Sequence, residues 1–287
     1  MSQKIKSQIQ RRSTLALAIL LTTLLLSACI IRLAYNNADW LLVWQLDKSF
    51  DLTRPQKEFL KGRLAGHLHW HRETELTKTI VFLRNTQAAV ANGMTKNQLE
   101  NALAEFATLR NTLAAQLADD SAEFFAQVSD EQLEYLQDTL KKSNKAWEKR
   151  LALAPHKRSA ERTERILDIV TDWIGPLSDA QTRQLTPSIE RLPDVLEIWL
   201  AHTKERQRQY VELVRAARSD RAAASGAFTA WISTEDVPPE LIAHRTAVYE
   251  LIIEIDRQST QTQRSHAIRK LQSWIDDLQL AVTQDAT

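Results

Sequence analysis

The chain has 287 residues, 37 basic and 36 acidic side chains, and a formal net charge of +1. This near-neutral balance argues against a nucleic-acid partner, and the single cysteine excludes an intramolecular disulfide. Glycine is scarce, whereas alanine, leucine, glutamine, glutamate and arginine are abundant. Because these abundant residues lose little entropy in a helix, we predict an all-α fold, an elongated bundle of long amphipathic helices.

The first 28 residues have the parts of a cleavable export signal. Four basic and no acidic side chains precede an apolar run, Leu15 to Leu26, that is too short to cross a bilayer. The run ends in Leu-Ser-Ala-Cys, which matches the lipobox of bacterial lipoproteins. We therefore expect cleavage between Ala28 and Cys29 and lipidation of Cys29, including palmitate. Removal of residues 1–28 takes four positive charges from a net charge of +1 and leaves −3.

The residue after the lipidated cysteine predicts whether the lipoprotein stays in the inner membrane or moves to the outer membrane. It is Ile30 rather than the aspartate that commonly retains lipoproteins in the inner membrane. We expect a lipid anchor in the outer membrane facing the periplasm, with an inner-membrane location as the alternative. Three acyl chains at about 0.8 kcal/mol per buried methylene would make an effectively permanent anchor. Residues 29–36 would then form a short tether that holds the folded body close to the membrane.

A helix-start signal recurs along the chain: an apolar residue, then Ser or Thr, and Gln three residues after it. This is a capping box, in which the hydroxyl and the glutamine side chain each bind a free backbone N–H of the first turn. The spacing of the copies favours a tandem repeat of two helical halves, 37–154 and 155–287, over chance recurrence. The boxes are Thr53/Gln56, Thr95/Gln98, Ser129/Gln132, Ser178/Gln181 and a weaker copy at Thr260/Gln263.

The spacing of apolar residues, together with the glycine and proline residues that end helices, predicts the helices in chain order. They are a short helix near 37–50 capped by Asn36, a long helix from 53 to about 91, then 95–126 and 129–153, a linker at 154–158, a helix to 174 stopped by Gly175-Pro176, a helix over 178–219 split by Pro187 and Pro193, a short helix to about 232, and a last one from 237–239 to about 281.

Six residues near the start of the mature chain are candidates for structure or interaction. We expect the two tryptophans to dock on the long helix, and the two acids to meet Arg63, His67 or Arg72. The two glycines share a helix face, which would let a helix or a tryptophan approach closely. These six candidates are Asp39, Trp40, Trp44, Asp47, Gly62 and Gly66.

His67 and His71 lie four residues apart on one predicted helix face, with Glu75 one turn further. They could share a metal, but a zinc site needs three or four converging ligands and no matching histidine pair exists elsewhere. We therefore favour a packing and hydrogen-bonding role for this face, and we expect no cofactor.

Several motifs resemble an uncharacterised family of Gram-negative lipoproteins. The resemblance rests on Arg32-x-x-Tyr35-Asn36-x-x-Asp39-Trp40, Asp47, Asp51-Leu52-Thr53-x-x-Gln56 and Trp70-His71-Arg72, and it implies no assigned activity. More loosely, the recurring boxes resemble the small periplasmic proteins named for a Leu-Thr-x-x-Gln motif, which are helical cradle-like chaperones and stress proteins. This chain is about twice as long, carries the lipobox and is rich in tryptophan.

No nucleophile motif, glycine-rich phosphate loop, HExxH or CxxC occurs in the sequence. We therefore expect a non-enzymatic, membrane-anchored periplasmic lipoprotein that binds an envelope protein partner or client, in a chaperone-like role. One alternative is a structural accessory of a single envelope-assembly machine. Another is a hydrolase of an envelope polymer that acts through Asp39, Asp47 and the His67–His71 face.

Overall fold

The computed structural model describes residues 35, 37–234 and 236–283, and every regular element among them is helical. The all-α prediction is therefore confirmed. The expected signal peptide 1–28, Cys29 and its tether, and Asn36 lie outside the described residues. The helices are α2 (Ala38–Phe50), α3 (Arg54–Trp70), the π-helical turn η1 (His71–Glu75), α4 (Leu76–Asn92), α5 (Lys96–Phe125), α6 (Asp130–Leu151), α7 (Pro155–Ile174), α8 (Asp179–Glu190), α9 (Leu196–Ala216), α10 (Arg221–Ser233), α11 (Pro239–Gln258) and α12 (Gln261–Thr283).

All five predicted capping boxes start a helix. At α3, α5, α6 and α8 the N-cap hydroxyl accepts from the glutamine N–H, and the glutamine side chain binds the N-cap N–H. The copy judged weaker is equally complete, because Thr260 N–H donates to Gln263 Oε1 at 3.0 Å and Gln263 N–H donates to Thr260 Oγ1 at 3.3 Å. The prediction of a single last helix is therefore wrong, because this capping box starts a new helix and divides the segment into α11 and α12.

Four further boundaries differ from the prediction. Pro187 lies inside α8 instead of splitting the helix, and the break falls between Glu190 and Leu196. Asn37 takes the N-cap position of α2 without a side-chain hydrogen bond. The predicted linker 154–158 is mostly helix, because Pro155 occupies the first turn of α7, where its missing N–H costs nothing. The long helix 54–92 is interrupted by η1, where one extra residue per turn shifts the register of α4 against α3.

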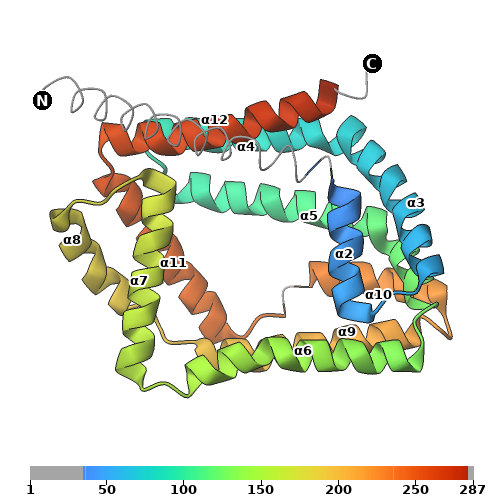
Figure 1. Cartoon of the computed structure of the whole chain (residues 1–287). Coiled ribbons are helices and arrows are strands. Elements are labelled where there is room, and N and C mark those ends of the chain that lie inside the picture. Colours follow the sequence, from blue (N-terminus) through green and yellow to red (C-terminus); the bar gives the residue numbers. More distant parts are fainter. Residues whose placement is uncertain (1–34, 36, 235, 284–287) are drawn as a thin grey trace, which may run out of the picture.

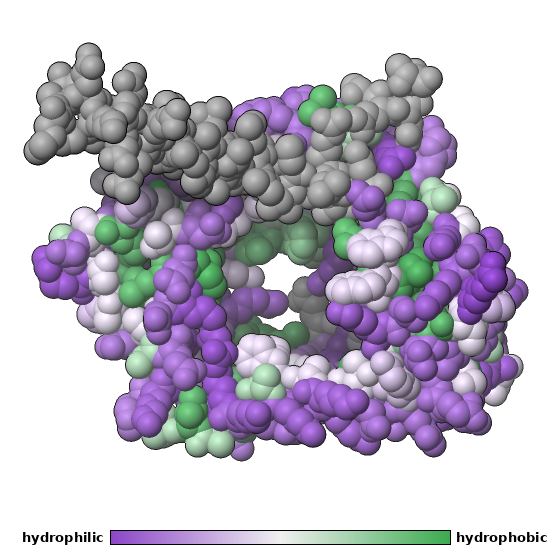
Figure 2. All heavy atoms as spheres, in the orientation of Figure 1, coloured by the Kyte–Doolittle hydropathy of each residue, from purple (hydrophilic) through white to green (hydrophobic). Residues whose placement is uncertain are grey.

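The helices are arranged as a frame. α4 packs beside α12 along one edge, α6 packs beside α9 along the opposite edge, and α3 and α7 form the other two edges (Figure 1). α5 lies within the frame in this view and packs against α10. Openings remain in the middle when all atoms are drawn as spheres (Figure 2). The bundle is not elongated along one axis, because the chain changes direction at η1 between α3 and α4 and again between α6 and α7 (Figure 1).

The two halves of the chain are interlocked. α2 contacts α3 and α6, and α7 contacts α8 and α12 in the same relation. α4 from the first half packs on α12 from the second, while α9 from the second packs on α6 from the first. A tandem repeat would produce these neighbours if the last helix of each half, α6 or α12, packed on a helix of the other half. The repeat itself stays a prediction, but the halves do not form separate cores.

Four of the five box glutamines pair across the structure. Gln56 Nε2 donates to Gln132 Oε1 at 2.9 Å and to the Gln127 carbonyl at 3.0 Å. Gln132 Nε2 donates in return to Gln56 Oε1 at 2.7 Å and to the Asp51 carbonyl at 3.0 Å. Each side-chain oxygen also accepts from its own N-cap N–H. We call this reciprocal pair a glutamine clasp. It satisfies two buried amides and joins the starts of α3 and α6.

A second glutamine clasp joins the starts of α8 and α12 with the same pattern. Gln181 Nε2 donates to Gln263 Oε1 at 2.8 Å and to the Gln258 carbonyl at 3.1 Å. Gln263 Nε2 donates to Gln181 Oε1 at 3.1 Å and to the Pro176 carbonyl at 2.8 Å. The fifth glutamine, Gln98, is exposed and has no clasp partner among the described residues.

The clasp should contribute more stability than a capping box alone. We expect Gln56→Ala to lower the free energy of unfolding by about 2–3 kcal/mol, because it leaves a buried amide and a buried carbonyl unsatisfied at about 1–3 kcal/mol each. Gln98→Ala, which removes the same box without a clasp, should cost about 1 kcal/mol or less. Urea unfolding of both variants measures the difference. Equal losses would mean that the clasp adds nothing to the cap.

Candidate functional site

Two tryptophans on α2 face solvent. The exposed fraction is 58% for Trp40 and 44% for Trp44, and their rings stack at 6.2 Å between centroids with 16° between planes. Lys48 Nζ lies 3.6 Å from the Trp44 ring centroid, a cation–π contact. We call these three residues the α2 tryptophan surface. The expectation that the tryptophans dock on the long helix is wrong, because α2 packs inward through Val43 and Phe50 on its other side.

The two acids of α2 have separate environments. Asp47 forms a 2.8 Å ion pair with Lys57 and accepts a 2.9 Å hydrogen bond from the Leu52 N–H, so it stabilises the α2–α3 turn. Asp39 is half-buried on the first turn of α2. Among the described residues, no ion pair joins either acid to Arg63, His67 or Arg72, which corrects our expected partners.

The expected basic partners bind elsewhere. Arg63 Nε lies 3.3 Å from Asp120 Oδ1 on α5, and Arg63 Nη2 lies 3.0 Å from Glu123 Oε2. The Arg72 guanidinium carbon lies 5.5 Å from the Tyr35 ring centroid. These contacts hold α3 against α5 and bring Arg72 over the residue that precedes α2. Of the basic side chains over 54–63, Arg63 is the one that finds its acids on α5, and no sequence signal links α5 to α3.

His67 and His71 also have different partners. His67 Nε2 lies 2.7 Å from Asp120 Oδ2, and His71 Nδ1 lies 2.8 Å from the Tyr35 hydroxyl. Burial lowers the pKa of His71, against a smaller opposing effect of Glu75. Glu75 is buried and pairs with Lys78 at 2.6 Å. Within the part of the chain that the structure describes, no three His, Cys, Asp or Glu side chains are grouped to hold a metal ion.

Trp70 and the glycine pair complete the candidates. Trp70 is half-buried, and its ring meets His71 edge-on with centroids 6.3 Å apart. Gly62 and Gly66 are exposed, and a Cβ added at either position would have no heavy atom within 4 Å. The expected close approach of a helix or tryptophan to these glycines is therefore wrong. Their face of α3 points to solvent, because α3 packs on α2 and α5 through other residues.

Alanine at these exposed helical glycines should stabilise the protein. We expect Gly62→Ala or Gly66→Ala to raise the free energy of unfolding by about 0.5–1 kcal/mol, because alanine has the higher helix propensity and nothing blocks its methyl group. Gly175→Ala is the matched contrast. Gly175 has φ +86° and a Cβ added there would lie 3.5 Å from His266, so this variant should destabilise. Chemical unfolding of the three variants tests the opposite signs.

An apolar pocket of about 320 Å³ opens between α4, α7, α11 and α12. We call it the α7–α11 pocket. Ile169 and Ile252, 52% and 37% exposed, belong to its lining and are apolar groups that face solvent. The volume falls at the lower end of the range of small-molecule sites, about 300–1,000 Å³. The lining further includes the charged side chains Asp256 and Arg264, and Val90, Met94, Val170, Trp173, Ile174, Ile255, Ser259 and Ala267.

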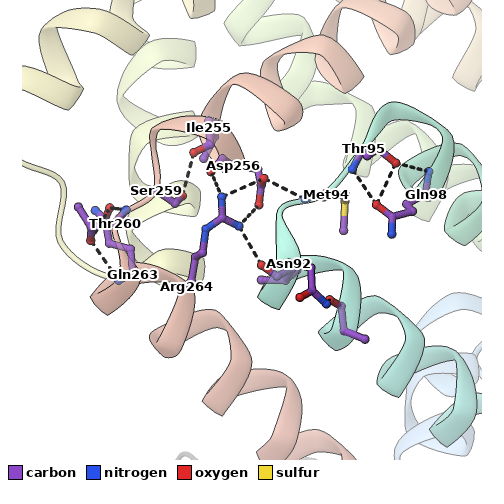
Figure 3. A network of polar contacts seen from close by, with 12 residues as sticks. Asn92, Met94, Thr95, Gln98, Ile255, Asp256, Ser259, Thr260, Gln263 and Arg264 are labelled. Atoms are coloured by element: carbon purple, nitrogen blue, oxygen red, sulfur yellow. Dashed lines mark hydrogen bonds and ion pairs between the residues drawn. The ribbon is translucent and has the colours of Figure 1, made fainter.

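An ion pair between two largely buried side chains forms part of the pocket wall. Arg264 Nη1 donates to Asp256 Oδ1 at 2.6 Å and to the Val90 carbonyl at 2.8 Å (Figure 3). Asp256 Oδ2 accepts from the Met94 N–H at 2.9 Å. The two side chains are only 15% and 13% exposed. The pair thus ties the α11–α12 turn to the α4–α5 turn, and both charges are already bound to protein groups.

Motif spacing and periodicity did not single out Asp256 and Arg264. A signal for them exists, because they flank the fifth capping box at the positions that Phe125 and Leu133 hold around the third. Comparing the boxes residue by residue would have drawn attention to a charged pair in place of two apolar side chains. Its partners Val90 and Met94 lie far away in the chain, so only the tertiary structure brings them to it.

The fold and these sites define an all-α protein of interlocked helical halves that combines solvent-facing tryptophans with an apolar pocket. The chain belongs to a family of unknown function, DUF6279, whose family model matches residues 48–224. No curated protein and no solved structure matches it. None of the helices in 37–234 and 236–283 has the length and apolar character needed to cross a bilayer.

Proposed function

We propose that this protein is a lipid-anchored, non-catalytic lipoprotein of the bacterial cell envelope that binds other envelope components. The α2 tryptophan surface carries the proposal. α2 starts at Ala38, nine residues after Cys29, and a chain of that length spans at most about 30 Å. Tryptophan favours the interface between membrane and water. A lipid on Cys29 would bring Trp40 and Trp44 to that interface, most simply on the periplasmic face of the outer membrane.

Binding is better supported than catalysis. The hydrolase alternative needs Asp39, Asp47 and the His67–His71 face to converge in one cleft. Instead Asp47 pairs with Lys57, His67 with Asp120 and His71 with Tyr35, each at a different helix contact. The α7–α11 pocket, by contrast, has a mostly apolar lining and solvent-facing isoleucines, and its two charged residues, Asp256 and Arg264, are paired with each other, which suits an apolar segment of a client or partner. It favours the chaperone-like form of the proposal over a purely structural accessory.

The anchor is tested by removing the cysteine. Cys29→Ala, exported behind a signal peptide that is cleaved without lipidation, should give a folded periplasmic protein absent from carbonate-washed membranes. The wild-type protein should stay in those membranes, because its acyl chains remain inserted. Fractionation followed by immunoblotting measures this. Retention of the variant in washed membranes would overturn the lipid anchor.

The proposed position of α2 at the membrane surface can be tested separately by tryptophan fluorescence quenching. In vesicles that contain brominated phospholipids, Trp40→Ala/Trp44→Ala should remove most of the tryptophan quenching seen with the anchored wild-type protein. Phe106→Ala removes an equally exposed aromatic ring, 55% exposed on α5, and should leave the quenching unchanged. Unchanged quenching in the tryptophan variant would place α2 away from the lipid.

Client binding can be measured without the anchor. Purified residues 30–287 should suppress aggregation of a chemically denatured client at a near-stoichiometric ratio, because apolar client segments would occupy apolar protein surface instead of associating. Light scattering records the effect, with an equal concentration of serum albumin as the control. No suppression by a folded protein would overturn the chaperone-like role and leave the accessory role, which predicts one dominant partner in envelope crosslinking.

A further inference from the structure

Each glutamine clasp joins two helix–turn–helix units in a two-fold relation. At the first clasp the units are α2–α3 and α5–α6, and α2 packs on α6 as α5 packs on α3. At the second clasp they are α7–α8 and α11–α12, and α7 packs on α12 as α11 packs on α8. Each glutamine donates to the other and to the backbone carbonyl two residues before the partner N-cap. Exchanging the two units therefore leaves the pattern of contacts unchanged, as a two-fold axis would.

The α4–α5 unit has the same turn as the α2–α3 unit. Two residues before the N-cap, Gly93 has φ +85° where Asp51 has φ +51°. In both turns the N–H of the next residue donates to an aspartate carboxylate at 2.9 Å. The capping box follows, with the Thr95 N–H donating to the Gln98 oxygen at 2.9 Å (Figure 3). The α4–α5 unit thus presents one half of a clasp.

The groups that a clasp uses are free at this turn. Neither the Gln98 side-chain NH2 group nor the Gly93 carbonyl forms a hydrogen bond with any described residue, and the Gln98 nitrogen points away from its box (Figure 3). Gln98 is exposed, whereas Gln56 and Gln132 of the first clasp are 4% and 8% exposed. The four other box glutamines already pair with one another, so no described capping box remains to pair with Gln98.

A groove beside Gln98 lies on the face that the first clasp buries. It has a volume of about 330 Å³ and runs between α4 and α5. Five of its lining residues stand where the α2–α3 unit has Val43, Leu46, Phe50, Phe59 and Leu60 relative to the capping box. Those apolar residues form one packed cluster with residues from the start of α6. The same face of the α4–α5 unit is open, and its five residues are Asn85, Ala88, Asn92, Asn101 and Ala102.

The groove suits a reversible contact between two identical surfaces. Among the described residues that line it, Glu105 alone is charged, and Lys96 and Glu100 beside the box pair with each other at 4.0 Å. Two copies can therefore meet here without extensive like-charge repulsion. The three asparagines each carry donors and an acceptor, so the amides of one copy can bind those of another and are solvated by water when the copies separate.

We propose that the α4–α5 unit binds the α4–α5 unit of a second copy of this chain, so that Gln98 and the partner subunit's Gln98 form a third glutamine clasp. An isologous contact places identical groups opposite each other across a two-fold axis, and both clasps within the chain already approximate that arrangement. Each Gln98 NH2 group donates to the side-chain oxygen and to the Gly93 carbonyl of the other copy. All of the free clasp groups are then engaged at once. This inference goes beyond the proposed binding function and does not require the lipid anchor.

Gln98→Glu removes the donors of the third clasp and keeps the capping box. A glutamate oxygen accepts from the N-cap N–H as a glutamine oxygen does, but two carboxylates would face each other across the axis. In sedimentation velocity from about 1 to 500 μM, residues 30–287 should show a monomer–dimer equilibrium that Gln98→Glu weakens at least tenfold. Gln116→Glu adds the same charge at an exposed position of α5 and should dimerise as the wild-type protein does.

Two results of that experiment would overturn the third clasp. One is a wild-type protein that stays monomeric at every concentration, which would leave the free box to a different protein or to water. The other is a Gln98→Glu variant that dimerises as strongly as the wild-type protein, which would place the contact elsewhere. A monomeric protein that still suppresses client aggregation would leave the proposed function intact while this inference fails.

Cross-linking locates the contact independently. Residues 30–287 contain no cysteine, because Cys29 is the only one in the chain, so Asn97→Cys supplies a single thiol beside Gln98. A short bismaleimide should join two copies of this variant into a covalent dimer. Thr108→Cys, at an exposed position about three turns further along α5, is the matched control and should stay largely monomeric. Cross-linking of both variants to the same extent, or of neither, would overturn the assignment.

Discussion

The structure depends on how buried glutamine side chains are satisfied. A glutamine in a capping box uses its oxygen on its own helix start, which leaves two N–H donors to place. In each clasp the side-chain NH2 group of one glutamine donates twice to the partner box. One hydrogen bond goes to the side-chain oxygen of the partner glutamine, and the other goes to the backbone carbonyl two residues before the partner N-cap. This requirement brings two helix starts together in a fixed orientation. The frame of helices in Figure 1 follows from two such constraints applied far apart in the chain.

Interlocking of the halves spreads this constraint over the whole molecule. Each clasp joins helices of one half, while the long antiparallel pairs α4–α12 and α6–α9 join the halves to each other. The clasps and the pairs therefore support different contacts, and neither half can move without breaking apolar surface shared with the other. Openings remain in the middle of the view in Figure 2 although α5 and α10 pack on each other and contribute to the buried cluster.

The two clasps differ in what they enclose. One adjoins a buried aromatic cluster, and the other adjoins an ion pair that lines a mostly apolar pocket. A buried ion pair is weak evidence for stability, because its desolvation cost offsets most of its attraction. Here the pair ties the α11–α12 turn to the α4–α5 turn through the Val90 carbonyl and the Met94 N–H. The exposed tryptophans of α2 and the pocket are two separate apolar surfaces of the protein.

The sequence by itself determined the helical class and the five helix starts that carry a capping box, because such a box is satisfied by residues within one turn of it. It did not determine which boxes pair, since Gln98 carries the same motif as Gln56 and joins no clasp in the described part of the chain. The tertiary structure also decided that the tryptophans of α2 and the glycines of α3 face solvent. Periodicity identifies an apolar face but not the partner that covers it. The pocket depends on helices distant in sequence, so only their packing could reveal it.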